Sequence, residues 1–511
     1  MCPSFIQNKI FCYSLLRYNK INIMKLLYLF ILCILFPCLL INCNKLDENY
    51  STNPNHKICF STDTFSFDTI LATVNSTTKQ LMVYNKNNQP LNIESVILAS
   101  PEKSGFRINV DGRKGSQFNN IRIAANDSMY IFVEITIDKT SSDPILLHED
   151  SILFYTNGTK QKVILNACGL NVNVLKGGTL INNDTVFSSR LPYLIYDSLV
   201  ISKNVTVNIE KGTTFYLHYA SKIISNGTII AKGTIESPII FRGDRFDNII
   251  EDLPYDRAPE QWGGITFGSE SFGNILDNVI VKNGTTGITC LPSNPNRLKL
   301  QVHNSQITNM GDNLFNADNC YIEAINSEFS NTSGHVVMLT GGRSYFAHCT
   351  LVNYMTLKER KIAAMSKTLC INQSTSKNSF IEFHNCIIDG SHNPSKDLSD
   401  IDNTGEIKVC SSNNNHFLFN HCVIKLKETK DNRLKNVIFI TDKINMNYKK
   451  TGGKENKYEF DFRPNNKDMA GIDKADLSIS ENIPFDRLGV NRTTHAPDIG
   501  AYEYIQTKTI Q

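Results

Sequence analysis

The densest run of charged residues in the chain lies between Arg242 and Trp262, and it carries the side chains best suited to bind a ligand. Carboxylate oxygens are the ligands that Ca²⁺ prefers, and aromatic rings commonly line small-molecule sites. The residues that would form a calcium or sugar site here are Asp244, Asp247, Asp252, Asp256, Arg257 and Trp262. The alternative, which we favour, is a long loop between coils, held by arginine–carboxylate pairs, with Trp262 filling the core.

Three histidines, His348, His384 and His421, recur at similar places in a repeat and suggest a metal column. Their alternation with buried positions along strands instead predicts surface or corner residues. No glycine-rich phosphate loop, nucleophile elbow or His-Glu-x-x-His zinc motif is present in the sequence. The paired-aspartate and Gly-His-Gly motifs of polygalacturonases are absent too. We therefore assign no catalytic residue and no metal site from sequence.

The elements that would carry such side chains follow from an internal repeat. Six seven-residue rows align at positions 277–283, 303–309, 325–331, 347–353, 384–390 and 420–426. The central steps, from Ser305 to Ser327 to Cys349, are each 22 residues, and longer steps elsewhere fit loop insertions. A period of this length is typical of a solenoid, in which each unit stacks on the next. The repeat predicts a parallel β-helix.

Two positions of each row share one face of a strand, because side chains alternate along it. The third position holds a small residue or a thiol and predicts a buried column: Val279, Ser305, Ser327, Cys349, Cys386 and Cys422. The fifth position, from Val281 to Ile424, is apolar. Asparagine closes four rows, at positions 283, 309, 331 and 353, and it tolerates the left-handed backbone of a tight corner.

The repeat also changes the interpretation of the 14 cysteines. A further column is expected through Cys290, Ala317, Leu339, Cys370 and Cys410, in the strand before each row. Stacked coils lie about 4.8 Å apart, which is closer than the usual Cα separation of a disulfide without forbidding one. We expect free, buried thiols that fill a narrow core, and disulfides remain the alternative.

The C-terminal tail carries the most recognisable motif. Asp486, Gly489 and Arg492 are followed by Pro-Asp-Ile-Gly-Ala-Tyr-Glu at 497–503. This D-x-x-G-x-x-R and P-D-I-G-A-Y-E pattern resembles the close of the choice-of-anchor Q β-helix proteins. The resemblance implies a right-handed parallel β-helix over residues 173–511, closed by a capping tail that shields the last coil.

Residues 59–172 alternate apolar and polar residues in about seven short segments separated by turns, as in a β-sandwich. Strand 79–85, the segment 90–93 and the turn 125–128 resemble the immunoglobulin-like domains related to the abnormal-spindle and hydin proteins. That resemblance implies a module that spaces or binds and that has no catalytic activity. We expect an all-β chain: an immunoglobulin-like β-sandwich followed by the β-helix.

Residues 1–43 read as a leader, followed by a tether over 44–58. Met24-Lys25 precedes an apolar run over 26–40 that suits a signal peptide, with Met1 and Met24 both as candidate starts. The run ends at Cys43 in a sequence that resembles a bacterial lipobox, although Asn42 departs from the usual small residue. The resemblance implies lipidation of Cys43 and an outer-membrane lipoprotein, periplasmic or surface-facing as in Bacteroidetes. An uncleaved anchor is the alternative.

The composition, 41% hydrophobic and 20% charged, suits a globular protein, and the formal charge of +3 excludes the basic character of a nucleic-acid binder. Two functions remain open. We expect a monomeric, membrane-anchored scaffold or glycan-binding protein without catalysis, with a polysaccharide as its partner and no cofactor other than calcium. The alternative is a polysaccharide lyase or glycoside hydrolase that acts on acidic glycans.

Overall fold

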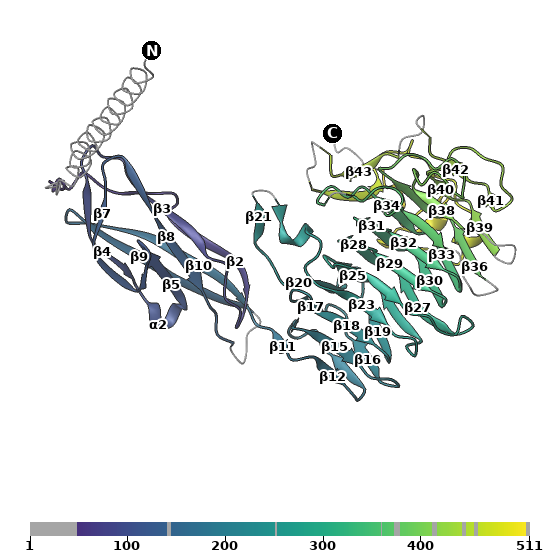
Figure 1. Cartoon of the computed structure of the whole chain (residues 1–511), viewed down its shortest axis with the longest axis horizontal. Coiled ribbons are helices and arrows are strands. Elements are labelled where there is room, and N and C mark those ends of the chain that lie inside the picture. Colours follow the sequence, from purple (N-terminus) through teal and green to yellow (C-terminus); the bar gives the residue numbers. More distant parts are fainter. Residues whose placement is uncertain are drawn as a thin grey trace, which may run out of the picture.

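The computed structural model describes residues 49–506 except 140–144, 251–252, 359, 373–378, 411–415, 442–445 and 454–457. Cys43 and Asp252 lie outside the described residues. The chain is almost entirely β: an N-terminal β-sandwich is joined to a parallel β-helix, as expected (Figure 1). Within the described ranges, no helix is both long and apolar enough to cross a membrane.

The sandwich has two five-stranded sheets. One contains β1 (Cys59–Phe60), β3 (Lys79–Asn85), β8 (Asp127–Ile135), β5 (Phe106–Val110) and β6 (Arg113–Gly115). The other contains β2 (Thr64–Leu71), β10 (Thr159–Leu170), β9 (Ile145–Thr156), β4 (Leu91–Leu98) and β7 (Gln117–Ile123), and the short helix α2 (Pro101–Ser104) links β4 to β5. All strand pairs are antiparallel except β2 and β10, which run parallel. Alternate residues such as Leu81 and Val83 are buried between the sheets.

The β-helix has three sheets in which every strand pair is parallel. The eleven-stranded sheet contains β11 (Asn173–Leu175), β14 (Tyr193–Ile195), β17 (Thr214–Leu217), β20 (Ile239–Gly243), β25 (Val279–Lys282), β28 (Gln306–Met310), β31 (Glu328–Thr332), β34 (Thr350–Asn353), β37 (Ile387–Gly390), β40 (Val423–Ile424) and β42 (Ile438–Phe439). The nine-stranded sheet contains β12 (Thr179–Ile181), β15 (Ser198–Ile201), β18 (Lys222–Ser225), β23 (Gly264–Phe267), β26 (Ile288–Cys290), β29 (Phe315–Asp318), β32 (Val337–Thr340), β35 (Leu369–Asn372) and β38 (Ile407–Val409). The ten-stranded sheet contains β13 (Thr185–Phe187), β16 (Thr206–Ile209), β19 (Thr228–Lys232), β24 (Asn274–Asp277), β27 (Leu298–His303), β30 (Tyr321–Ile325), β33 (Arg343–Ala347), β36 (Phe380–His384), β39 (His416–Asn420) and β41 (Leu434–Lys435).

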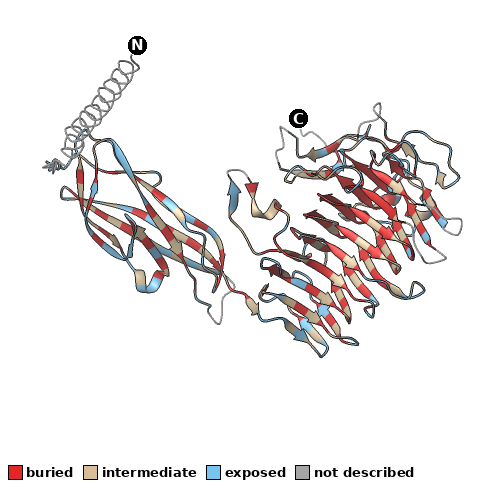
Figure 2. Cartoon of the chain, viewed as in Figure 1, coloured by how far each residue is buried: buried red, intermediate tan, exposed pale blue. Residues whose placement is uncertain are grey.

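The fifth positions of the repeat rows stack from coil to coil. Val281 pairs with Ile307, Ile307 with Phe329, and Phe329 with Leu351, and the series continues to Ile424. All six side chains are buried in one continuous hydrophobic core. Figure 2 shows that strands of the β-helix are largely buried along its length.

The third-position side chains are not only small; several of them also form hydrogen bonds to the backbone of the preceding coil. The Ser305 hydroxyl accepts the backbone N–H of Val279 at 3.0 Å, and the Ser327 hydroxyl accepts that of Ser305 at 3.1 Å. The Cys386 sulfur accepts the Cys349 N–H in the same way, at 3.4 Å. Ser305, Ser327 and Cys386 therefore each give a partner to the buried N–H of the preceding third-position residue, next to a coil corner.

The corner itself lies at the second position of each row. Its residues take a left-handed backbone with φ between 48° and 54°: Asn278, Asn304, Asn326, His348, Asn385 and His421. The closing asparagines at positions 283, 309 and 331 also have positive φ, and position 353 is not among the residues that do. His348 is at a corner, as expected, but it is fully buried instead of facing solvent.

The expected column of Cys290, Ala317, Leu339, Cys370 and Cys410 breaks at Cys370. Cys290 pairs with Ala317 and Ala317 with Leu339, but Leu339 then pairs with Ile371. A slip of one residue places a side chain on the other face of the sheet, so Cys370 leaves the column. Every cysteine among the described residues is a free thiol.

The C-terminal segment covers a flank of the β-helix, which corrects the expected cap on the last coil. It contains β43 (Tyr448–Thr451), β44 (Phe460–Pro464), α3 (Leu477–Ser480) and the 3-10 turn η3 (Arg492–Thr494). Apolar residues of this segment, such as Phe462 and Ile499, pack on Val352, Ile387 and Val423 of the eleven-stranded sheet. The outward-facing positions of these coils are apolar, so the tail packs against the side of the β-helix.

Candidate functional site

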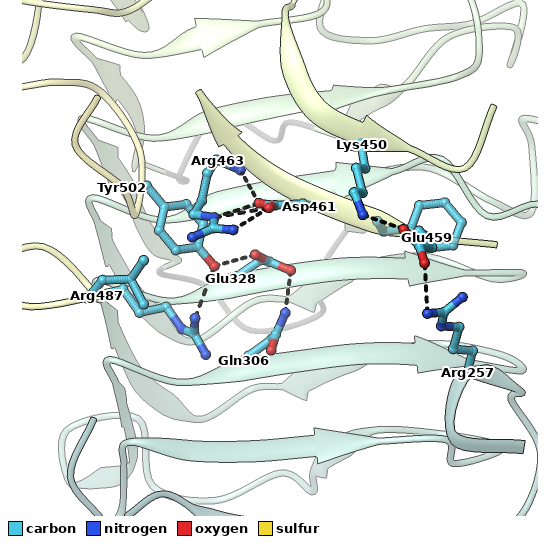
Figure 3. Close-up of a pocket in the computed structure, with 11 residues that line it drawn as sticks. Arg257, Gln306, Glu328, Lys450, Glu459, Asp461, Arg463, Arg487 and Tyr502 are labelled. Carbon is cyan, nitrogen blue, oxygen red and sulfur yellow. Dashed lines mark hydrogen bonds and ion pairs between the residues drawn. The ribbon is translucent and has the colours of Figure 1, made fainter. Parts of the chain in front are cut away.

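A hollow of about 410 Å³ opens between this C-terminal segment and the eleven-stranded sheet (Figure 3). It is lined by side chains from four separate parts of the chain: Arg257, Gln306, Glu328, Lys450, Glu459, Phe460, Asp461, Arg463, Arg487, Leu488 and Tyr502. We call it the flank pocket. Its volume is within the range of small-molecule sites, and charged groups dominate its lining.

Gln306 and Glu328 occupy the fourth position of adjacent repeat rows, so they point outward from β28 and β31. Glu328 is buried, and its carboxylate accepts hydrogen bonds from the Gln306 amide at 2.9 Å, from the Ser330 hydroxyl at 2.6 Å and from the Tyr502 phenol. Burial raises the pKa of Tyr502 well above its ordinary value, and the Glu328 carboxylate adds to the effect. Tyr502 therefore stays protonated and donates a hydrogen bond to Glu328.

The hairpin of β43 and β44 supplies a second wall of the pocket. Glu459 accepts bonds from Lys450 and, at 3.0 Å, from Arg257, and these bonds lower the pKa of Glu459. Asp461 pairs with Arg463, whose Nε lies 2.8 Å away. Burial alone would raise the pKa of Asp461, but the hydrogen bonds from Arg463 outweigh it and lower the pKa. Both carboxylates stay ionised at neutral pH.

Arg487 is the cation of the flank pocket that forms no direct ion pair with a carboxylate in the described part of the chain. One guanidinium nitrogen donates to the Tyr502 oxygen at 3.1 Å. The Arg487 Nε is buried and has no hydrogen-bond partner among the described residues. Since the lining holds four cations and three carboxylates, the flank pocket carries one excess positive charge. It offers an anion a partner at Arg487.

Of the six residues singled out in the 242–262 stretch, the five that the structure describes do not form one site. Asp244 pairs with His218 at 2.6 Å and Asp247 pairs with Arg245, and both carboxylates line a separate hollow of about 240 Å³ beside strand β2 of the sandwich. Asp256 is held by Arg242 at 2.8 Å and Lys282 at 2.7 Å. Among these five described residues, only Arg257 reaches the flank pocket, from the 3-10 turn η1 (Tyr255–Arg257) that follows the β21 (Asn248–Ile250) and β22 (Leu253–Pro254) hairpin.

Trp262 lies in the β-helix core with none of its surface exposed. Its indole N–H donates to the Lys282 carbonyl at 2.8 Å. It offers no ring face to a sugar, so the structural interpretation of this residue replaces the ligand-binding one. The arginine–carboxylate pairs around Asp247 and Asp256 fit the same interpretation of the loop.

No cluster of three or more His, Cys, Asp or Glu side chains in the described ranges is arranged to hold a metal ion. His348, His384 and His421 belong to three different environments. His348 bonds to the Ser480 hydroxyl at 2.8 Å, His384 lies 3.4 Å from Glu382, and His421 lies 3.6 Å from Asp476. Binding of calcium stays a prediction.

The sequence held two signals for the flank pocket that pattern reasoning missed. The fourth position of the rows is apolar or Thr in four of the six, but it is Gln306 and Glu328 in the other two, next to each other. Arg487 and Tyr502 lie inside the tail motif that suggested closure alone. Nothing in the sequence marks Lys450, Glu459 or Arg463, because only the hairpin's position makes them neighbours of Glu328.

No family model matches this sequence, and no curated protein matches it. Among solved structures, the ASH / PapD-like domain of human CEP192 is 9% identical and aligns over 26% of this chain and 96% of that domain, with a TM-score of 0.16. The E. coli chaperone DraB is 12% identical over 22% of this chain and 54% of its own, with a TM-score of 0.16. The catalytic domain of a GH87 alpha-1,3-glucanase is 8% identical over 66% of this chain and 91% of that chain, with a TM-score of 0.13. TM-scores this low carry no inference about function.

Proposed function

We propose that this protein is a cell-envelope lipoprotein that binds an anionic glycan in the flank pocket, without catalysis. The observation that carries the proposal is Arg487, a cation without a carboxylate partner among the described residues, in a 410 Å³ hollow with an excess positive charge. Arg463, Lys450 and Arg257 are already paired with carboxylates, and their remaining N–H groups suit sugar hydroxyls. Phe460, which is partly buried and also lines the pocket, adds an apolar contact.

The binding test uses a glycan array probed with the chain lacking residues 1–43, followed by titration of each ligand found. We expect uronic-acid or sulfated glycans to bind, and Arg487→Ala to weaken binding at least about tenfold, which is about 1.4 kcal/mol. Arg433→Ala is the matched control, because Arg433 is paired with Asp431 outside the flank pocket. Equal affinity of the wild-type and Arg487→Ala proteins would contradict the proposal.

The anchor is a separate part of the proposal. The signal-like run before Cys43, and the resemblance to the choice-of-anchor Q proteins, support an outer-membrane lipoprotein whose sandwich spaces the β-helix from the membrane. Metabolic labelling with a fatty-acid analogue should mark the wild-type protein and the Cys38→Ser control but not Cys43→Ser. Absence of label on the wild-type protein would favour the uncleaved anchor, and protease treatment of whole cells would report which side of the membrane the protein faces.

A polysaccharide lyase or glycoside hydrolase remains the second candidate, and one observation favours it. Glu328 and Tyr502 form a buried, hydrogen-bonded carboxylate–phenol pair at the wall of the flank pocket. Such a pair can act in general acid–base catalysis. Release of reducing or unsaturated ends from uronic-acid glycans, lost in Glu328→Gln, would establish this function. Absence of both products would leave binding as the activity.

A further inference from the structure

The outer face of the ten-stranded sheet carries a second group of functional side chains, on the other side of the asparagine corner from the flank pocket. Gln301, Glu323, Tyr345 and Glu382 pair in series on strands β27, β30, β33 and β36. Phe380 of β36 pairs in turn with His416 of β39. Neighbouring strands are about 4.8 Å apart, so these six side chains form a continuous band, which we call the sheet-face band.

The two carboxylates of the sheet-face band are held in fixed orientations. Glu323 lies 2.9 Å from His303 and accepts from the Gln301 amide at 3.2 Å. Glu382 lies 2.9 Å from His416 and 3.4 Å from His384. The hydrogen bond from His303 lowers the pKa of Glu323, which keeps that carboxylate ionised. Both glutamates are partly exposed, so their remaining lone pairs face solvent.

Aromatic rings lie between and beside these carboxylates. Phe380 is 51% exposed and stacks on the His416 ring, with 4.8 Å between centroids. Tyr345 lies between the two glutamates in the strand order and packs against His384. Burial raises the pKa of Tyr345 to about 12, with contributions from Cys386 and both glutamates, so its hydroxyl is a neutral hydrogen-bond donor.

We propose that the sheet-face band binds an uncharged polysaccharide chain that lies along the β-helix axis. Ring faces suit the apolar C–H faces of sugars, and the fixed carboxylates, the Gln301 amide and the Tyr345 phenol suit their hydroxyls. The repeat of side chains from coil to coil fits a ligand that is itself a repeating chain.

Charge selects the class of glycan. The band holds two carboxylates, and Arg343, stacked on the Tyr321 ring at 5.0 Å, is one cation beside it. The excess negative charge repels an anionic chain, in contrast to the flank pocket. A protein partner is disfavoured, because the band lacks the apolar centre of a protein interface and its strands are already paired on both sides.

The test uses the full-length chain in detergent micelles and four soluble uncharged probes: dextran, laminarin, mannan and arabinan. Polygalacturonate serves as the anionic probe. We expect at least one uncharged probe to bind, and both Phe380→Ala and Glu382→Gln to weaken its binding about tenfold or more. Met338→Ala is the control, because Met338 lies partly exposed on the nine-stranded sheet. Unchanged thermal melting would show that the variants are folded.

The binding proposals for the flank pocket and for the sheet-face band can be tested separately. Arg487→Ala should reduce binding of polygalacturonate and leave the uncharged probe unaffected, whereas Phe380→Ala should do the reverse. The inference is overturned when no uncharged probe binds, when Phe380→Ala and Glu382→Gln bind it as the wild type does, or when Arg487→Ala abolishes its binding. If the wild-type protein binds an uncharged probe but does not bind polygalacturonate, that result counts against the proposed function and not against this inference.

Discussion

At the scale of single residues, the tail is attached through Arg492. Its guanidinium is fully buried and pairs with Glu503, which is also buried. It donates further to the Asn326 side-chain oxygen at 2.8 Å and to the Gly500 carbonyl at 3.0 Å. One arginine therefore links the two halves of the tail motif to a corner of the β-helix.

Removal of this guanidinium leaves a buried carboxylate without its cation. We expect Arg492→Ala to lower the free energy of unfolding by about 3–5 kcal/mol, the cost of breaking a buried pair from one side. The control is Arg463→Ala, whose partly exposed pair with Asp461 is worth about 1 kcal/mol or less. Urea unfolding of both variants measures the difference, and equal losses would show that Arg492 does not anchor the tail.

Gly500 makes the same attachment possible through its backbone. It has a φ of +104°, and a Cβ there would lie 2.7 Å from the Ile387 side chain and 2.9 Å from the Thr350 hydroxyl. We expect Gly500→Ala to weaken the packing of the tail on the sheet. Limited proteolysis should then cleave the segment C-terminal to Asp486 faster than in the wild type. Gly158→Ala is a matched control, since Gly158 also has a positive φ but nothing lies within 4 Å of its Cβ position. Similar proteolysis of the two variants would refute this account.

At the scale of elements, the third-position column explains why both serine and cysteine occupy this position, serine at Ser305 and Ser327 and cysteine at Cys349, Cys386 and Cys422. Both side chains accept the N–H of the preceding coil, and both donate to the carbonyl two residues earlier, as Ser327 does to Ile325 and Cys386 does to His384. The requirement is a small side chain that is both donor and acceptor, so size alone does not define the position.

This account predicts different results for two substitutions at Ser327. Ser327→Ala leaves the buried Ser305 N–H without its acceptor and should lower the free energy of unfolding by about 1–3 kcal/mol. Ser327→Cys keeps an acceptor, as Cys386 does for Cys349, and should cost less than the alanine variant. Urea unfolding compares them, and an equal loss would mean that packing alone defines the column.

At the scale of the whole molecule, stability should depend on pH through two histidines whose pKa is lowered, the fully buried His348 and the partly buried His335. Burial lowers the pKa of His348 well below its ordinary value, and Arg492 adds to the effect. Burial, together with Lys367, lowers the pKa of His335 to about 4. Below pH 6.5 the unfolded chain binds more protons at these sites than the folded one does, so stability falls as pH falls from about 6.5 towards 4.

Glu503 acts in the opposite direction, because burial raises its pKa to about 7 and its contribution is lost as pH rises from about 4.5 to 7. A single substitution separates the two effects. His348→Asn places at this corner the residue that the neighbouring coils have at Asn326 and Asn385. We expect its stability to fall less steeply between pH 6.5 and 5 than that of the wild type, by up to about 1.4 kcal/mol per pH unit. Parallel pH profiles would contradict this assignment.

The sequence by itself determined the β-helix and the residues that stack within it. Each coil pairs in parallel with the next, so a repeat in the sequence becomes a column in space, and the fifth-position residues from Val281 to Ile424 could be aligned without coordinates. The corner was only partly predicted. The closing asparagines suggested a left-handed corner at the seventh position of the rows. The structure has a left-handed residue, Asn or His, at the second position of all six rows.

The tertiary structure alone decided where the candidate sites are. The flank pocket joins Arg257, Glu328, Lys450 and Tyr502, which come from four segments far apart in the chain. The repeat does not relate these segments to one another. The tail lies outside the repeat and is placed by apolar contacts with outward positions such as Ile387 and Val423. Local pattern fixes which side chains point out of a coil, but long-range packing selects which of them the tail covers and which it leaves to line a site.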